Sequence, residues 1–184
     1  CSGLTQIDLP DGLATLDTYA FADCTGLRAV SFGSALNRIA SGAFQNCTGL
    51  TVIAIPDHVI AIDSYAFYGC SNLKSVALGT GLAGIGSLAF YGGVGLREVD
   101  LPAGVVAIQD RAFDGCANLQ AIRVDAANPA FSGGDGVLFD RAGTTLLQYP
   151  DGKAGDYNVP AGVTAIGTYA FNGCAGLSGV ELPD

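Results

Sequence analysis

Short segments in which apolar and polar residues alternate recur along the chain. The first is Leu4-x-x-Ile7-x-Leu9 with Pro10 after it, and the pattern returns from Leu27, Leu50, Leu73, Leu96, Leu119 and Leu177. Alternation with a period of two is typical of a strand with one buried face, and proline cannot continue a sheet ladder. Each copy therefore predicts a short strand and a turn, and stacked copies predict a parallel sheet.

A second, weaker apolar pair follows most of these segments, as in Leu13 with Leu16, Leu36 with Ile39 and Val163 with Ile166, and it predicts a short second strand. An Ala-Phe pair comes next, with Cys or Gly three residues after the Phe and Leu three residues later. Spacings of three predict one helical or 3₁₀ turn on the opposite side of each unit. The Ala-Phe pairs are Ala20-Phe21, Ala43-Phe44, Ala66-Phe67, Ala89-Phe90, Ala112-Phe113 and Ala170-Phe171.

The whole pattern repeats every 23 residues, as the five phenylalanines from Phe21 to Phe113 show. A period of this length indicates stacked coils that contact only their neighbours. We therefore expect an α/β solenoid over residues 1–184, a single right-handed array of about eight coils. A parallel sheet would line its concave side, and helical or 3₁₀ turns its convex side.

The rhythm breaks once, because Phe113 and Phe171 are 58 residues apart. The extra residues lie at about 125–160. They contain two β-rich runs, 137–139 and 144–149, around a four-residue loop that includes Gly143, and this arrangement predicts a hairpin. The strand-and-proline pattern resumes at 157–160, so we expect the main sheet to continue past the insertion without loss.

The charge of the chain excludes two classes of partner. Seventeen acidic and eight basic side chains give a net charge of −9, and Lys and Arg do not cluster. Nucleic acids and anionic membranes need concentrated positive charge. Apolar runs stay far below the ~18 residues of a membrane span, so insertion into a bilayer is not expected. Because the chain begins within a repeat, without a signal-like segment, we interpret it as part of a longer protein.

The side chains that often carry chemistry are explained by the repeat. Cys1, Cys24, Cys47, Cys70, Cys116 and Cys174 share one position of the coil. Their Cβ vectors should run parallel about 4.8 Å apart, whereas a disulfide needs converging Cβ atoms about 3.8 Å apart. We expect buried free thiols. His58 and the G-x-G-x-x-G match at 79–84 lie in inter-strand turns, so no catalytic residue, cofactor or metal site is expected.

The outward side chains of the main sheet are the best candidates for a binding surface. They form two columns, Gln6, Ala29, Val52, Ser75, Glu98, Ala121 and Gly179 beside Asp8, Ser31, Ala54, Ala77, Asp100, Arg123 and Glu181. From these we single out Ala29, Ser31, Val52, Ala54, Ser75, Ala77, Glu98, Asp100 and Arg123. The alternative is that small side chains are simply tolerated on a solvated sheet. Phe139, Leu147 and Tyr149 of the hairpin are further candidates, unless they cover the coil below.

The motif from Cys47 to Phe67, repeated from Leu96 to Phe113, resembles the BspA-like, or Treponema pallidum-type, leucine-rich repeat family. The insertion resembles one that this family carries, at 128–131, 135–139 and 146–150. Gly93 departs from the pattern, because a Cys is expected there. The resemblance implies an extracellular bacterial surface protein that adheres to host or matrix proteins or to other bacteria, without catalytic residues.

A structural spacer or stalk, with binding located elsewhere in a longer protein, is the competing interpretation. Self-association is also open, because the ends of a solenoid expose unpaired strand edges.

Overall fold

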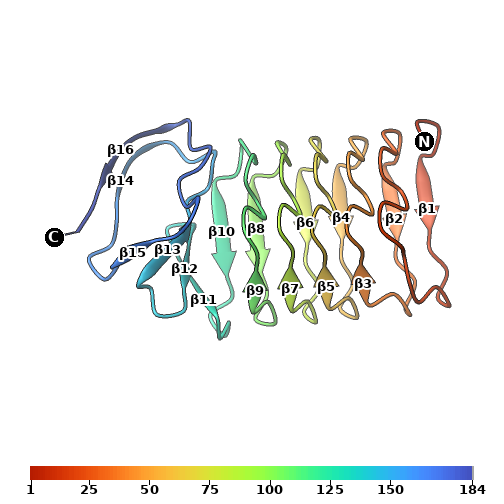
Figure 1. Ribbon diagram of the computed structural model, residues 1–184, viewed down its shortest axis with the longest axis horizontal. Helices are drawn as coiled ribbons and strands as arrows, with labels where there is room; N and C mark the ends of the chain where they lie inside the picture. The colour runs from red at the N-terminus through yellow and green to blue at the C-terminus, as the bar shows by residue number, and fades with distance from the viewer. Residues whose placement is uncertain (184) are drawn as a thin grey trace.

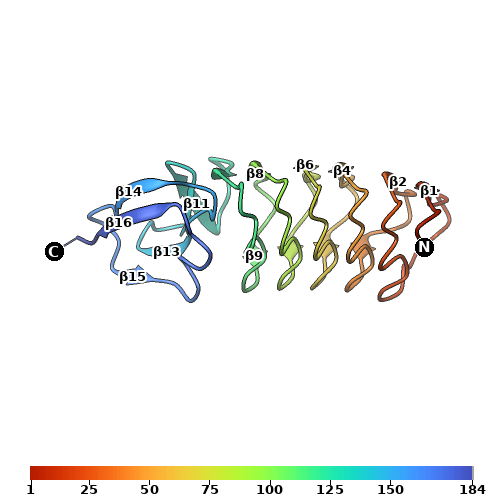
Figure 2. The same ribbon diagram turned by 90° about the horizontal axis from the view of Figure 1, so that it is seen from above.

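The computed structural model describes residues 1–183 and shows a β-solenoid of about eight turns. Asp184, the last residue of the predicted domain, lies outside the described residues. The coils from β1 to β10 follow one another in a nearly straight row, with a strand on one side of each coil (Figures 1 and 2). The sheet side therefore shows little of the expected concave curvature.

The strands of the main row come from the alternating segments, as predicted. They are β1 (Gln6–Asp8), β2 (Ala29–Ser31), β4 (Val52–Ala54), β6 (Ser75–Ala77), β8 (Glu98–Leu101) and β10 (Ala121–Val124). They pair in parallel, two by two, as β1 with β2, β4 with β6 and β8 with β10. Partners such as Val52 and Ser75 are one repeat apart, so equivalent residues of neighbouring coils face each other.

The short second strands form a longer ladder than the main row does. They are β3 (Arg38–Ile39), β5 (Ala61–Ile62), β7 (Gly84–Ile85) and β9 (Ala107–Ile108), and together they make one four-stranded parallel sheet. The second strand expected at 13–16 is not formed in the first coil.

The prediction of helical turns is not confirmed, because residues 1–183 contain only hydrogen-bonded turns at these places. The backbone N–H of Phe44 donates to the carbonyl of Ala66 in the next coil, 2.8 Å away, rather than to its own turn. The residue before each Ala-Phe pair also has a left-handed backbone, for example Tyr65 with φ of 62°. No helix that could cross a membrane occurs within the described part of the chain.

The core is a stack of aromatic rings with one ring per coil. Phe21, Phe44, Phe67, Phe90 and Phe113 stack with centroids 5.3–5.7 Å apart and interplanar angles of 7–12°. The last four rings are fully buried. The 23-residue period therefore reports a physical column of rings, as the sequence predicts.

The insertion contains the predicted hairpin and one further strand. Strands β11 (Phe131–Gly134), β12 (Val137–Asp140) and β13 (Thr145–Gln148) pair antiparallel in that order. The carboxylate of Asp140 fixes the hairpin loop by accepting hydrogen bonds from the backbone N–H of Thr144 and Thr145. Figure 1 shows this meander where the regular row ends.

The chain beyond the hairpin rejoins the solenoid through the second strand. β13 pairs in parallel with β15 (Ala165–Ile166), so one hairpin strand takes the place of a second strand. The Tyr149 N–H donates to Ala170 O over 2.8 Å, the bond that Phe44 makes in a regular coil. Tyr149 therefore occupies the phenylalanine position of the irregular coil.

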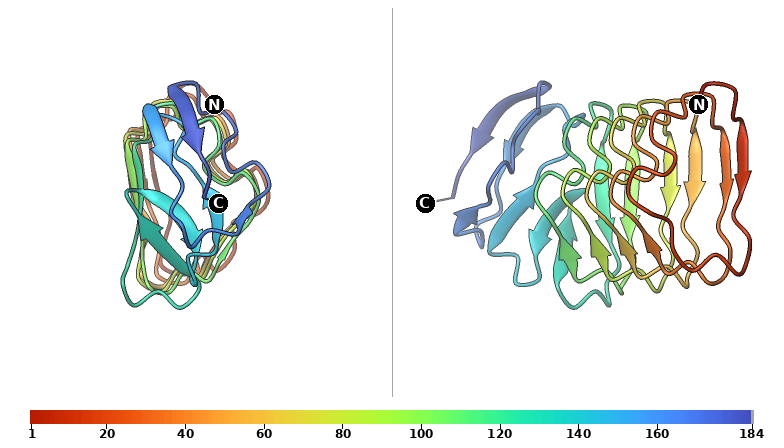
Figure 3. Two further views of the ribbon diagram at one scale, coloured as in Figure 1. Left: turned by 90° about the vertical axis from the view of Figure 1, so that its left-hand side faces the viewer. Right: turned by 45° about the vertical axis from the view of Figure 1, so that its right-hand side comes forward.

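The expectation of an unbroken main sheet is wrong. β14 (Gly155–Asn158) pairs with β16 (Leu177–Glu181) and not with β10. The N–H of Ile122 in β10 donates instead to Gly136 O, at the turn between β11 and β12, over 2.8 Å. The insertion thus lies against the edge of β10, and β14 and β16 are set apart from the row (Figure 3).

Candidate binding surface

The sheet face consists of the nine outward residues predicted above, from Ala29 to Arg123. All nine are exposed, and the residues between them, such as Ile53 and Val76, are buried. Pairing in register places Val52 beside Ser75 and Ala54 beside Ala77. The two predicted columns are therefore present between β4 and β6, and the same register joins β8 to β10.

The centre of the sheet face is small, uncharged and flat. Val52 is its large apolar side chain, with 56% of its surface exposed, and alanine and serine surround it. An exposed valine among short side chains can be covered by a flat partner at little steric cost. The same surface has no convergent polar groups, so it is poorly suited to hold a small molecule or to perform chemistry.

One end of the sheet face is charged. Arg123 of β10 binds the carboxylate of Glu98 of β8 through both terminal nitrogens, with 2.7 Å between Nη2 and Oε1. Asp100 lies 3.6 Å from Nη1 of the same guanidinium. The hydrogen bonds from Arg123 lower the pKa of Glu98. These side chains are half-exposed, so the group marks a charged rim and contributes little to stability.

Two of the three hairpin candidates are buried. Phe139 is 5% exposed and Tyr149 1% exposed, because both pack in the second core cluster of the C-terminal coils. A partner that docks on the folded chain would not reach them. Leu147 is half-buried and packs against the main core. The aromatic content of the insertion thus fills the irregular coil, and Leu147 alone keeps accessible surface.

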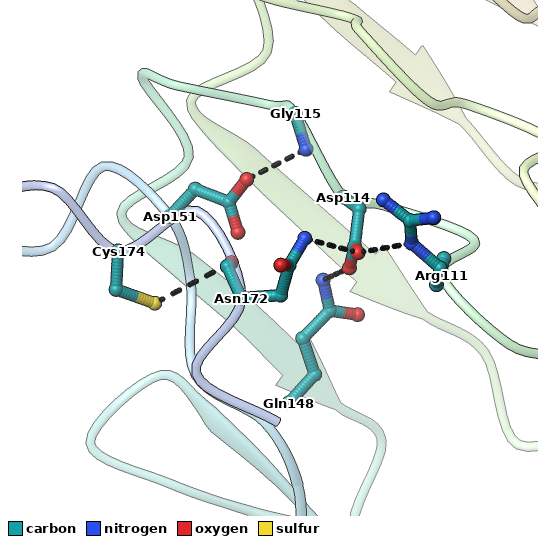
Figure 4. Close-up of polar contacts among 7 residues, drawn as sticks. All are labelled: Arg111, Asp114, Gly115, Gln148, Asp151, Asn172 and Cys174. Atoms are coloured by element: carbon teal, nitrogen blue, oxygen red, sulfur yellow. Dashed lines mark hydrogen bonds and ion pairs between the residues drawn. The ribbon is translucent and has the colours of Figure 1, made fainter. Parts of the chain in front are cut away.

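A buried polar cluster that the sequence did not reveal joins the irregular coil to its neighbours (Figure 4). Asp114 is 2% exposed, and its Oδ2 accepts hydrogen bonds from Arg111 Nε and Asn172 Nδ2, both over 2.9 Å. Asp151 Oδ2 accepts from the Gly115 N–H over 2.6 Å, while its Oδ1 is buried without a partner. Burial raises the pKa of Asp151 to about 6. The cluster holds three successive coils together.

The cysteine column is buried as expected, except at its ends. Cys24, Cys47, Cys70 and Cys116 are buried, and the Sγ of Cys70 donates to Phe44 O of the preceding coil over 3.2 Å. Burial raises the pKa of Cys47 to about 11 and that of Cys70 to about 12. These thiols stay protonated at neutral pH, and a protonated thiol is neither a good nucleophile nor a metal ligand. Within residues 1–183 no group of His, Cys, Asp or Glu is arranged to hold a metal.

The remaining candidates for chemistry are structural. Gly79 and Gly81 of the G-x-G-x-x-G match approach the carbonyl groups of Pro56 and Asp57 so closely that a Cβ atom would collide with them. His58 Nε2 lies 3.1 Å from Gly33 O in the turn of the preceding coil. A depression of about 410 Å³ over β5 and β7 is shallow and lies away from the sheet face.

Exposed tyrosines form a second surface, which was not predicted. The tyrosine strip consists of Tyr19, Tyr65, Tyr68, Tyr91 and Tyr169 with Arg111, on the turns around the Ala-Phe pairs. The ring centroids of Tyr65 and Tyr68 are 5.7 Å apart, and those of Tyr68 and Tyr91 are 5.0 Å apart. A signal was present in the sequence, because Tyr68 and Tyr91 are one repeat apart and Tyr19 and Tyr65 are two.

Comparison with known proteins places this geometry in a family. The BspA type leucine rich repeat region matches residues 1–120 and 151–184, in six copies. The gap in the match coincides with the hairpin insertion. A search of curated proteins found no match.

Solved structures with the same fold include bacterial surface proteins. The pneumococcal vaccine antigen PcpA has a TM-score of 0.88 and 26% identity, over 98% of this chain and 45% of its own. A leucine rich cell surface protein of Faecalibacterium prausnitzii has a TM-score of 0.78 and 27% identity, over 97% of this chain and 55% of its own.

The leucine-rich repeat protein of T. pallidum has a TM-score of 0.66 and 25% identity, over 97% of this chain and 69% of its own. The chain thus spans about half the length of PcpA and of the F. prausnitzii protein. The repeat, the stacked core and the matched profile agree that this chain belongs to the BspA-type leucine-rich repeat family.

Proposed function

We propose that the chain is a non-enzymatic protein-binding region of a bacterial cell-surface protein and that it binds through the sheet face. The partner would be a host or matrix protein, or a protein on another bacterium, met outside the cell. The flat, exposed centre of the sheet face, Val52 among serine and alanine, is the observation that carries this proposal. The likeness to a vaccine antigen and to a cell surface protein supports the location.

The arrangement of the sheet face fits the anatomy of protein interfaces. Protein partners bury an apolar centre and leave charged residues at a solvated rim. Val52 is at the centre, and Glu98, Asp100 and Arg123 lie at one end. Such a rim directs orientation and association rate more than affinity. Burying Val52 against an apolar partner would supply about 1–2 kcal/mol at ~25 cal/mol per Å².

The proposal is tested by capturing surface and matrix proteins on the immobilised chain. A paired substitution, Val52→Glu with Ser75→Arg, places two charges on adjacent coils of the sheet face. Val106→Glu with Ala83→Arg is the matched control, because Val106 is 51% exposed and its N–H donates to Ala83 O of the adjacent coil near the second strands. Binding should be lost with the first pair and kept with the second. Equal binding by both pairs would contradict the proposal.

A structural spacer is the alternative function, and one observation favours it. Hot spots in protein interfaces are enriched in Trp, Tyr and Arg, whereas the sheet face offers mainly alanine and serine at its centre. As a spacer, the chain would capture no protein in the experiment above. Specific binding would then lie in another part of a longer protein.

A further inference from the structure

The tyrosine strip is continuous because each coil contributes residues at the same two positions. The residue before each Ala-Phe pair is held by a backbone hydrogen bond to the next coil, for example from Tyr65 N–H to Ser87 O over 3.0 Å. The residue after the pair, such as Tyr68 or Tyr91, lies in the neighbouring column. The rings therefore follow the long axis of the solenoid and leave faces open to solvent.

One cation of the chain already occupies this strip. The guanidinium carbon of Arg111 lies 5.5 Å from the centroid of the Tyr91 ring and 5.0 Å from that of Tyr169. Both distances fall within the range of about 6 Å in which a cation is attracted to an aromatic face. Arg111 is the only Lys or Arg in the two columns. Its position shows that the spacing of the rings accommodates a guanidinium group.

The other rings of the strip have no such cation. Tyr19 is 52% exposed and Tyr65 37% exposed, and Tyr68 contacts Tyr65 and Tyr91 by its ring alone. Asp17 and Asp23 are exposed within four residues of Tyr19, and the chain carries a net charge of −9. A basic segment would therefore be attracted by the overall field and could place its cations on the free rings.

We propose that the tyrosine strip binds a segment of a protein partner that is rich in arginine or lysine. The side chains of this segment stack on Tyr19, Tyr65 and Tyr68 as Arg111 stacks on Tyr91 and Tyr169. The negative charge of the domain favours this occupant over a neutral polysaccharide, which would use the rings but not the charge. The strip is separate from the sheet face, so this proposal stands even if the sheet face binds nothing.

The test measures binding of a labelled nona-arginine peptide by fluorescence anisotropy. The variant Tyr65→Leu with Tyr68→Leu removes two rings without changing the net charge. Leucine is compatible with the backbone of Tyr65, because Leu88 occupies the same column with φ of 58°. Val106→Ala with Ile60→Ala is the control, since both side chains are half-exposed and lie outside the strip. Circular dichroism verifies that each variant is folded.

Removing the two rings should weaken peptide binding by about 5- to 25-fold, that is about two- to fivefold for each ring. The control should bind like the wild type. An unchanged affinity of the Tyr65→Leu, Tyr68→Leu variant would overturn the proposal, because binding would then rest on net charge alone. Tighter binding of maltoheptaose, a neutral oligosaccharide, than of the peptide would overturn it in favour of a carbohydrate ligand.

Discussion

Replacing Phe67 by leucine tests the ring column in the middle of the array. Phe67 is fully buried and stacks on Phe44 and on Phe90, with centroids 5.5 and 5.3 Å away and interplanar angles of 8°. Leucine keeps most of the apolar volume but removes both stacked pairs. Each pair is worth about 0.5–1.5 kcal/mol beyond the buried area. The small cavity adds ~0.5 kcal/mol, so the free energy of unfolding should fall by about 1.5–3.5 kcal/mol.

Phe21→Leu is the matched control at the edge of the same column. Phe21 is partly exposed and has one stacked partner in the column, Phe44, with 5.7 Å between centroids. Its replacement should cost about 1 kcal/mol, since one pair is lost and less surface is buried. Urea unfolding followed by circular dichroism measures both values. Equal costs for Phe67→Leu and Phe21→Leu would refute the idea that stability is a sum of contacts between neighbouring coils.

Three further predictions concern the interior. A thiol reagent should label exposed Cys1 rapidly in the folded chain and Cys70 only after unfolding, since burial raises the pKa of Cys70 to about 12; rapid labelling of Cys70 would contradict this. The pKa of Asp151 is raised to about 6 from 3.8 by burial, so the folded chain binds the proton more tightly and stability decreases from pH 5 to pH 7. The decrease should be about 1 kcal/mol and should vanish in Asp151→Asn; a pH dependence that persists in this variant would exclude Asp151 as its source. Gly136→Ala should cost about 2–3 kcal/mol in urea unfolding, because φ is 76° and the new Cβ would lie 2.8 Å from Ala121 Cβ; a cost below ~0.5 kcal/mol would show that this turn adapts easily.

The sequence predicts the regular coils well because their signals are periodic. Phe44 and Phe67 are one repeat apart and stack in the core, and Val52 and Ser75 are one repeat apart and pair in the sheet. A residue that recurs every 23 positions must meet its copies when coils stack, so the pattern determines the columns directly. The outward columns of the sheet face follow from the same rule.

The turns were harder to predict because spacing alone does not distinguish a helical turn from one bonded to the next coil. Tyr65 has a left-handed backbone, which is uncommon for a residue other than glycine and carries no mark in the sequence. The Phe44 N–H is satisfied by Ala66 O, one coil away. Local spacing therefore predicted a helix where contacts between coils decide the structure.

The insertion departs from the prediction because its pairing depends on contacts distant in sequence. Gly136 lies against β10 and accepts the hydrogen bond from Ile122 that a continuing sheet would use. Tyr149 takes a phenylalanine position although it is 36 residues after Phe113. Its distance of 22 residues from Phe171 was the available signal.

Site-specific photo-cross-linking tests most directly the claim that the sheet face binds a protein partner. A benzoylphenylalanine is introduced at Ala54, which is exposed between Val52 and Ala77, and in a second variant at Val106 near the second strands. In the presence of a captured partner, the Ala54 variant should form a cross-link to it and the Val106 variant should not. A cross-link from Val106 and none from Ala54 would contradict the account.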